Sequence, residues 1–109
     1  MAIRLSIPVV INTSYGGFGL SEAAALELMR RKGLTCRRDS GYLVVGETGC
    51  QTVEDIVPRD DQDLIEVVRI MGDIANGDRA RLAVSTVEIR IVFENYDGKE
   101  RIVVSGWLT

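Results

Sequence analysis

The stretch VEIRIVFENYDGKERIVV, residues 87–104, decides which kind of fold this chain can adopt. Apolar residues alternate with polar ones on both sides of Asp97-Gly98, a residue pair that favours a type I′ hairpin turn. If these two residues form the turn, Glu94 lies opposite Arg101, and apolar side chains lie opposite apolar side chains. The stretch therefore predicts a β-hairpin in this register.

The predicted hairpin carries apolar side chains on both of its faces. Phe93 and Ile102 face each other on one side, whereas Val92 and Val103 add apolar surface to the other. Small soluble domains rarely leave a large apolar patch exposed to water. A helix or another subunit must therefore cover part of this surface, and we expect a homo-oligomer.

Two amphipathic helices are predicted before the hairpin. Ser21 is a typical N-cap, and the apolar spacing that follows predicts a helix over 21–32. Asp60 is the predicted cap of the second helix, whose apolar residues recur at helical spacing until Asn76-Gly77. Gly72 lies inside this second pattern, where a bend is one possibility.

Short strands complete the predicted fold. Ile3 to Ile11 is rich in β-branched residues, and Pro8 within it indicates an edge strand because proline cannot donate to a sheet ladder. Tyr42 to Val45 is a second short strand, which can pair with Thr35 to Arg38. The order β-α-β-α-β-β predicts one α+β domain over 1–109, a small, mostly antiparallel sheet with two helices packed on one face.

Composition narrows the functions that this chain can have. Its net charge is −3, which is not typical of proteins that bind duplex nucleic acid. It has no histidine, which excludes Ser-His and Cys-His nucleophile pairs, and its two cysteines, Cys36 and Cys50, cannot close a zinc site alone. The absence of a signal peptide or an apolar run of ~20 residues predicts a cytoplasmic protein away from membranes, with reduced thiols. We expect no cofactor, no metal and no catalytic residue.

The glycine-rich segment Asn12–Ser21, NTSYGGFGLS, is the main candidate binding site. A strand, a glycine-rich turn and a helix N-terminus in succession present unpaired N–H groups to an anion. Tyr15 or Phe18 can stack on a nucleotide base. The segment matches no named phosphate-binding motif, and a tight turn with both aromatic residues in the core is the alternative. The candidate ligand-binding residues are Asn12, Tyr15, Gly16, Gly17, Phe18, Gly19, Ser21, Arg37, Arg38 and Arg59.

Several blocks of the sequence resemble a group of small proteins encoded by bacteriophages and prophages. The blocks are Ile11–Ser21, Arg59–Gly72, Ala75–Gly77, Val87–Ile89 and Tyr96–Gly98. The resemblance implies an accessory phage protein that acts in the cytoplasm of the bacterial host, and such proteins often inhibit host defence.

Three functions are compatible with these patterns. The first is non-enzymatic sequestration of a phosphorylated small molecule, such as a nucleotide immune signal, whose charge Arg37, Arg38 or Arg59 would neutralise. The second is direct inhibition of a host defence protein through an acidic surface. That surface would contain Glu47, Glu54, Asp55, Asp60, Asp61 and Asp63. The third is a metal-assisted enzyme that uses Asp60, Asp61 and Asp63, although helix capping and the helix dipole are the favoured explanation of these residues.

Overall fold

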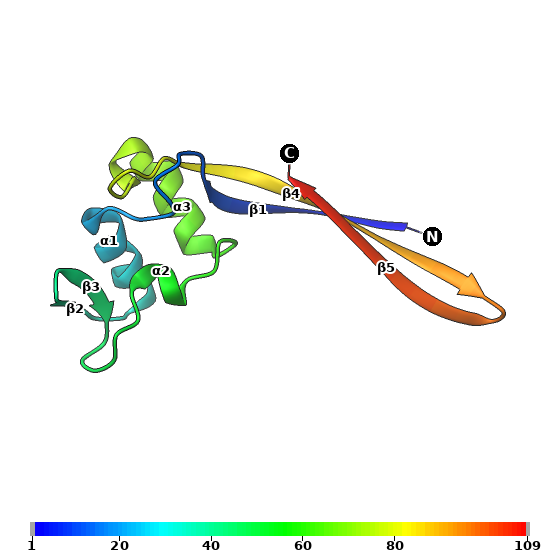
Figure 1. Cartoon of the computed structure of the whole chain (residues 1–109), viewed down its shortest axis with the longest axis horizontal. Coiled ribbons are helices and arrows are strands. Elements are labelled where there is room, and N and C mark those ends of the chain that lie inside the picture. The colour runs from blue at the N-terminus through cyan, green and yellow to red at the C-terminus, as the bar shows by residue number, and fades with distance from the viewer. Residues whose placement is uncertain (1, 109) are drawn as a thin grey trace.

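The computed structural model describes residues 2–108, which form a helical body and a long β arm (Figure 1). The elements are β1 (Ala2–Asn12), α1 (Glu22–Lys32), β2 (Cys36–Asp39), β3 (Tyr42–Val45), α2 (Val53–Ile56), α3 (Gln62–Met71), the 3₁₀ turn η1 (Gly72–Ala75), β4 (Leu82–Tyr96) and β5 (Lys99–Leu108). The arm is an antiparallel sheet in the order β1-β4-β5, and the body contains the other elements. The predicted α+β class is confirmed.

The arm gives the molecule an elongated shape. Its extents are 59 × 29 × 24 Å and its radius of gyration is 17.9 Å. A compact domain of this length has a radius of gyration of about 13 Å. In Figure 1 the hairpin of β4 and β5 extends far from the helices, so most of the arm has no body residues beside it.

The hairpin has the predicted register throughout. Tyr96 pairs with Lys99, Phe93 pairs with Ile102, and the predicted pairs between these positions are also present. Asp97 and Gly98 have φ angles of 52° and 82°, as a type I′ turn requires. The guanidinium of Arg101 lies 2.6 Å from the Glu94 carboxylate.

The first strand lies at a sheet edge, as Pro8 indicates. β1 pairs only with β4 within the arm, and Pro8 lies opposite Thr86. β4 begins at Leu82 and is therefore longer than the pattern from Val87 onward indicates. Its additional residues pair with the end of β1 and carry the sheet into the body.

Helix α1 follows its sequence signals closely. The Ser21 hydroxyl accepts a hydrogen bond from the Ala24 N–H at 3.1 Å, and Gly33 ends the helix with a φ of 68°. The guanidinium of Arg30, 2.6 Å from the Glu27 carboxylate, holds the pKa of Glu27 well below its usual range, at about 2. Arg31 contacts both Glu27 and Glu66, so it links α1 to α3.

Helix α3 differs from the prediction at both ends. Its N-cap position is Asp61 rather than Asp60, and the Asp61 side chain does not cap the helix because its carboxylate binds Lys32. The α-helix ends at Gly72, where φ is 58° and ψ is −132°. Glycine adopts this conformation without steric cost, so the chain leaves the α-helix there. The turn η1 then extends the element to Ala75.

The segment between the two main helices contains a hairpin and a short helix. β2 and β3 pair as predicted, with Cys36 opposite Val45. The helix α2 was not predicted, because four residues are too few for a periodic pattern. The Asp55 carboxylate accepts the Thr52 N–H at 3.1 Å at the start of this helix.

The core lies between the helices and one end of the sheet. Leu28 of α1, Leu64 of α3 and Val53 of α2 are buried there. The sheet contributes Val10, Leu82 and Val84, which all lie on one face because Val10 pairs with Val84. The predicted packing of two helices on one face is therefore confirmed, but only at the base of the arm.

Candidate functional site

The glycines of the segment Asn12–Ser21 allow close contact with the loop before β4. Leu20 forms a β-bridge with Asn76, and the Gly77 N–H donates to the Gly19 carbonyl at 2.9 Å. A Cβ atom on Gly16 would overlap the backbone and side chain of Arg79. Gly17 has open space around it and a φ of 83°. Close approach of two chain segments thus accounts for Gly16, and a turn accounts for Gly17.

Polar groups of the segment already have partners within the protein. The Asn12 amide oxygen accepts the Arg81 N–H at 2.9 Å, and the Ser21 hydroxyl caps α1. The Leu20 N–H donates to the Glu54 carboxylate at 3.2 Å. A carboxylate of the chain itself therefore lies at the N-terminal end of α1, where the sequence predicts the phosphate of a ligand.

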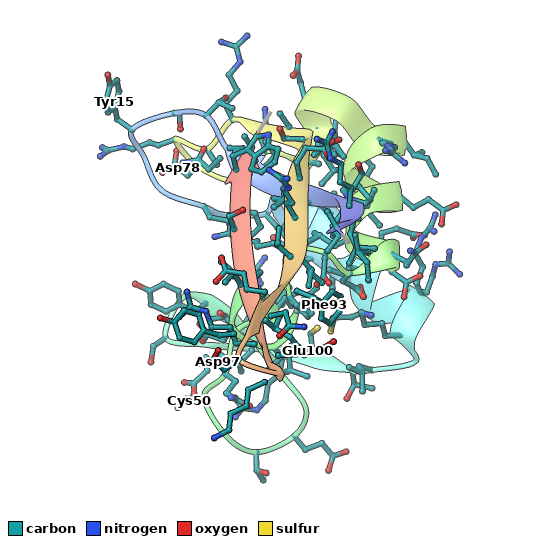
Figure 2. All side chains as sticks on the ribbon, turned by 90° about the vertical axis from the view of Figure 1, so that its right-hand side faces the viewer. Tyr15, Cys50, Asp78, Phe93, Asp97 and Glu100 are labelled. Atoms are coloured by element: carbon teal, nitrogen blue, oxygen red, sulfur yellow. The ribbon has the colours of Figure 1, made fainter. Side chains whose placement is uncertain are left out.

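The two aromatic residues of the segment lie in different environments. Phe18 packs against the core, and the guanidinium carbon of Arg59 lies 3.6 Å from its ring centroid, a cation–π contact. Arg59 also donates to the Val10 carbonyl at 3.3 Å. Tyr15 is fully exposed and extends away from the rest of the chain (Figure 2). Tyr15 is thus available for a partner, whereas Phe18 is an anchor in the body.

The three predicted arginines are held apart by their own contacts. Arg37 donates to the Glu47 carbonyl at 3.1 Å. Arg38 forms an ion pair with Glu22 in the first turn of α1. Arg59 lies over Phe18 and therefore beside the glycine segment, whereas Arg38 lies at the start of α1.

A cavity of about 390 Å³ lies beside the N-terminal end of α1. Its polar lining includes Glu22, Glu54, Asp78, Arg38 and Thr52. Leu20, Ala25, Leu43 and Val53 supply apolar wall, and Gly41 and Tyr42 complete the lining. Tyr42 is 67% exposed, so its ring is available at the surface of the cavity. The cavity thus combines an apolar wall with three carboxylates.

Charges in this cavity favour a cationic ligand. Arg38 is its one basic residue, and its charge is already opposed by Glu22. The carboxylates of Glu54 and Asp78 therefore leave a net negative site, in which a positive group is attracted and a phosphate is repelled. Of these residues, sequence reasoning included Glu54 and Arg38 as candidates but not Asp78 or Tyr42. Asp78 lies in a loop and Tyr42 in the short strand β3, and no sequence motif marks either residue.

Two of the three aspartates in residues 60–63, Asp61 and Asp63, form an ion-pair cluster with Lys32. The Lys32 ammonium lies 2.6 Å from Asp61 and 3.2 Å from Asp63. Within residues 2–108, no group of three or more His, Cys, Asp or Glu side chains is placed to hold a metal ion. The cluster joins the end of α1 to the start of α3.

Of the two thiols, Cys50 is exposed, and burial raises the pKa of the half-buried Cys36.

Replacing Lys32 by alanine is expected to destabilise the protein by about 1–3 kcal/mol. The Asp61 side chain is only 12% exposed and would lose its cation. The hydrogen bond with Asp61 raises the pKa of Lys32 above 10.5. The ion pair therefore stabilises the folded protein fully below pH 10.5, and this stabilisation is lost as the pH rises through the raised pKa of Lys32. Urea denaturation at neutral and alkaline pH measures both effects. Lys99→Ala at the exposed arm tip is the control, and an equal loss there would contradict the prediction.

Comparisons with known proteins found no match: no family model fits the chain, and no curated protein or solved structure is significantly similar to it. The likeness to phage-encoded proteins therefore stays a prediction. Among residues 2–108, no helix has the length and apolar character needed to cross a bilayer.

Proposed function

We propose that this chain is a non-enzymatic protein-binding module whose cavity beside α1 accepts a basic side chain of its partner. The observation that carries this proposal is the convergence of Glu22, Glu54 and Asp78 on one cavity that has an apolar wall. A lysine or arginine side chain has an apolar stem and a charged end, and it matches both parts of such a site. Tyr42 adds an aromatic ring that can contact the cation.

In this proposal the partner is a protein with a basic segment. The chain has a net charge of −3, which also favours approach of a basic surface. If the resemblance to phage-encoded proteins is correct, the partner is a defence protein of the bacterial host. The acidic surface of the direct-inhibition hypothesis then shares Glu54 with the predicted one but not Asp61 and Asp63, which are paired with Lys32.

Capture of a phosphorylated small molecule is the second candidate function. The backbone of Gly17 has open space around it, and Tyr15 close by in the same loop is fully exposed. These groups can contact a phosphate and a base from one side of the loop. Glu54 at the start of α1 opposes an anion there, so this function is proposed only as the alternative.

Binding of an oligoarginine peptide tests the first candidate. We expect the double variant Glu54→Gln, Asp78→Asn to bind the peptide at least about 10-fold more weakly than the wild type, measured by titration calorimetry at low salt. Because the contacts are ionic, the wild-type affinity should fall as salt is added. Glu100→Gln at the arm tip removes a carboxylate far from the cavity and should leave the affinity within about twofold.

Two outcomes would contradict the proposal. Equal loss of peptide affinity in the cavity and arm-tip variants would show that binding follows net charge alone. A thermal shift of several degrees with a nucleotide, without peptide binding, would favour the second candidate. In that case Gly17→Val should abolish the nucleotide shift in a folded protein.

A further inference from the structure

The arm has an apolar face that the helical body leaves uncovered. It consists of the odd-numbered residues of β1 from Ile3 to Ile11, the odd-numbered residues of β4 from Val87 to Phe93, and the even-numbered residues of β5 from Ile102 to Leu108. Apart from Gly106, each of these residues is Ile, Leu, Val or Phe. All of them are half-buried or exposed.

The opposite face of the same sheet carries the charged residues of the arm. Glu94 lies there opposite Arg101, and Arg90 lies opposite Ser105, with Val92, Val103 and Trp107 as apolar residues between them. The core contacts of the sheet, made by Val10, Leu82 and Val84, also lie on this opposite face. The helices therefore cover this opposite face at its base, and no element within residues 2–108 covers the apolar face.

The chain exposes more surface than a compact monomer of its mass. Its accessible area is 7494 Å², whereas a compact monomer of this mass exposes about 6,000 Å². The difference of about 1,500 Å² exceeds the ~800 Å² that each partner buries in a standard stable interface. The surplus is spread over both faces of the arm, and it is large enough to contain an interface of standard size.

We propose that the apolar face docks on the same face of a second copy of this chain. The face is self-complementary, because a two-fold axis would set uncharged apolar rows against identical rows. Two such sheets pack about 10 Å apart with interdigitated side chains. The face has no charged group that would select a different partner, so an identical chain can cover all of it. Homodimer interfaces are also more apolar than the interfaces of transient complexes.

The dimer is independent of the cavity proposed above. The cavity is formed by body residues of α1, α2, β2, β3 and the adjoining loops, whereas the apolar face belongs to the arm. Face-to-face pairing of two arms would leave both cavities accessible and join two binding sites in one particle. Bivalence of this kind raises the affinity for a partner that carries two basic segments.

Replacing Ile91 by lysine tests the dimer. Ile91 lies on the central strand, with Ile3 opposite on one side and Val104 opposite on the other. Sedimentation of the wild type should give twice the 12.0 kDa mass of one chain. The variant would bury a charge in an apolar interface, and we expect its dimer dissociation constant to rise by roughly 100-fold or more.

Val92→Lys is the matched control on the opposite face of the same strand. It introduces the same charge at the next residue, so it should leave the dimer intact. Circular dichroism reports whether each variant folds. Val104→Lys, at a position 63% exposed in the single chain, supplies the same test if Ile91→Lys does not fold.

Three results would overturn the proposal. The first is a folded wild type that sediments as a monomer at all concentrations. The second is equal dissociation of the Ile91→Lys and Val92→Lys variants. The third is a monomer that binds phosphatidylcholine vesicles through this face, since the covering surface would then be lipid rather than a second chain.

Discussion

Replacing Leu28 by alanine is expected to destabilise the protein by about 2–5 kcal/mol. Leu28 has no exposed surface, and it lies in the core between α1, α3 and the base of the sheet. The change removes apolar contacts and leaves a cavity that close-packed neighbours fill only in part. Because domains of this size are stable by only about 5–15 kcal/mol, the loss should be visible as a lower urea midpoint.

Leu26→Ala is the matched control for this prediction. Leu26 lies in the same helix and undergoes the same chemical change, but it is 47% exposed. We expect a change within about 0.5 kcal/mol, because a surface substitution in a helix leaves no cavity and alanine has the higher helix propensity. Equal destabilisation by both variants would show that α1 does not pack as described.

Gly77→Ala is expected to have the second large effect, a loss of about 1–3 kcal/mol. A Cβ atom at this position would lie 2.6 Å from the Gly19 carbonyl carbon and 2.7 Å from its oxygen. These are backbone atoms, held by the bridge between Leu20 and Asn76, so they cannot rotate away. The loop before β4 would have to separate from the glycine segment, with loss of the Gly77–Gly19 hydrogen bond.

Gly19→Ala is the control from the other side of the same contact. The nearest atom to a Cβ on Gly19 is the Gly77 Cα at 4.0 Å, which is ordinary van der Waals separation. Thermal unfolding should therefore show a clear drop in Tm for Gly77→Ala and little change for Gly19→Ala. If Gly19→Ala were the more damaging variant, Gly19 would have a role beyond packing, as the anion-site prediction implies.

Local interactions account for the parts of the fold that could be predicted. The hairpin register follows from Asp97-Gly98 and from the alternation around it, which involve residues close in sequence. Helix α1 carries its own cap at Ser21 and its own end at Gly33. Pro8 restricts β1 to an edge, because a missing N–H cannot be replaced by distant contacts.

Longer-range contacts decided where the second helix begins and ends. Asp60, Asp61 and Asp63 are all suitable for the start of a helix, and the sequence cannot choose among them. The ammonium of Lys32, distant in sequence, binds Asp61 and Asp63 and makes them part of a link between helices. Similarly, apolar spacing continues beyond Gly72, but the backbone leaves the α-helix at that glycine.

In the candidate site, too, some features follow from the local sequence and others from contacts between distant segments. The sequence identified the glycine segment as unusual, because several glycines before a helix N-cap are rare without a reason. Only the tertiary structure showed that reason, the close approach of the loop that contains Gly77 and Arg79. The cavity brings together Glu22, Glu54 and Asp78 from three separate segments, and no local pattern connects them.

The sequence by itself determined the positions of the strands and of the two main helices, and the hairpin register, since these depend on alternation, capping and turn residues within a few positions of one another. The tertiary structure decided how far the arm extends from the body, which face of the sheet the helices cover and which charges meet in the cavity. Those features depend on contacts between distant segments, and their free energies arise only when the whole chain has packed. The uncovered apolar face shows both contributions. The alternation within each strand places its apolar residues on one side, and the packing of the helices against the other side leaves that face exposed.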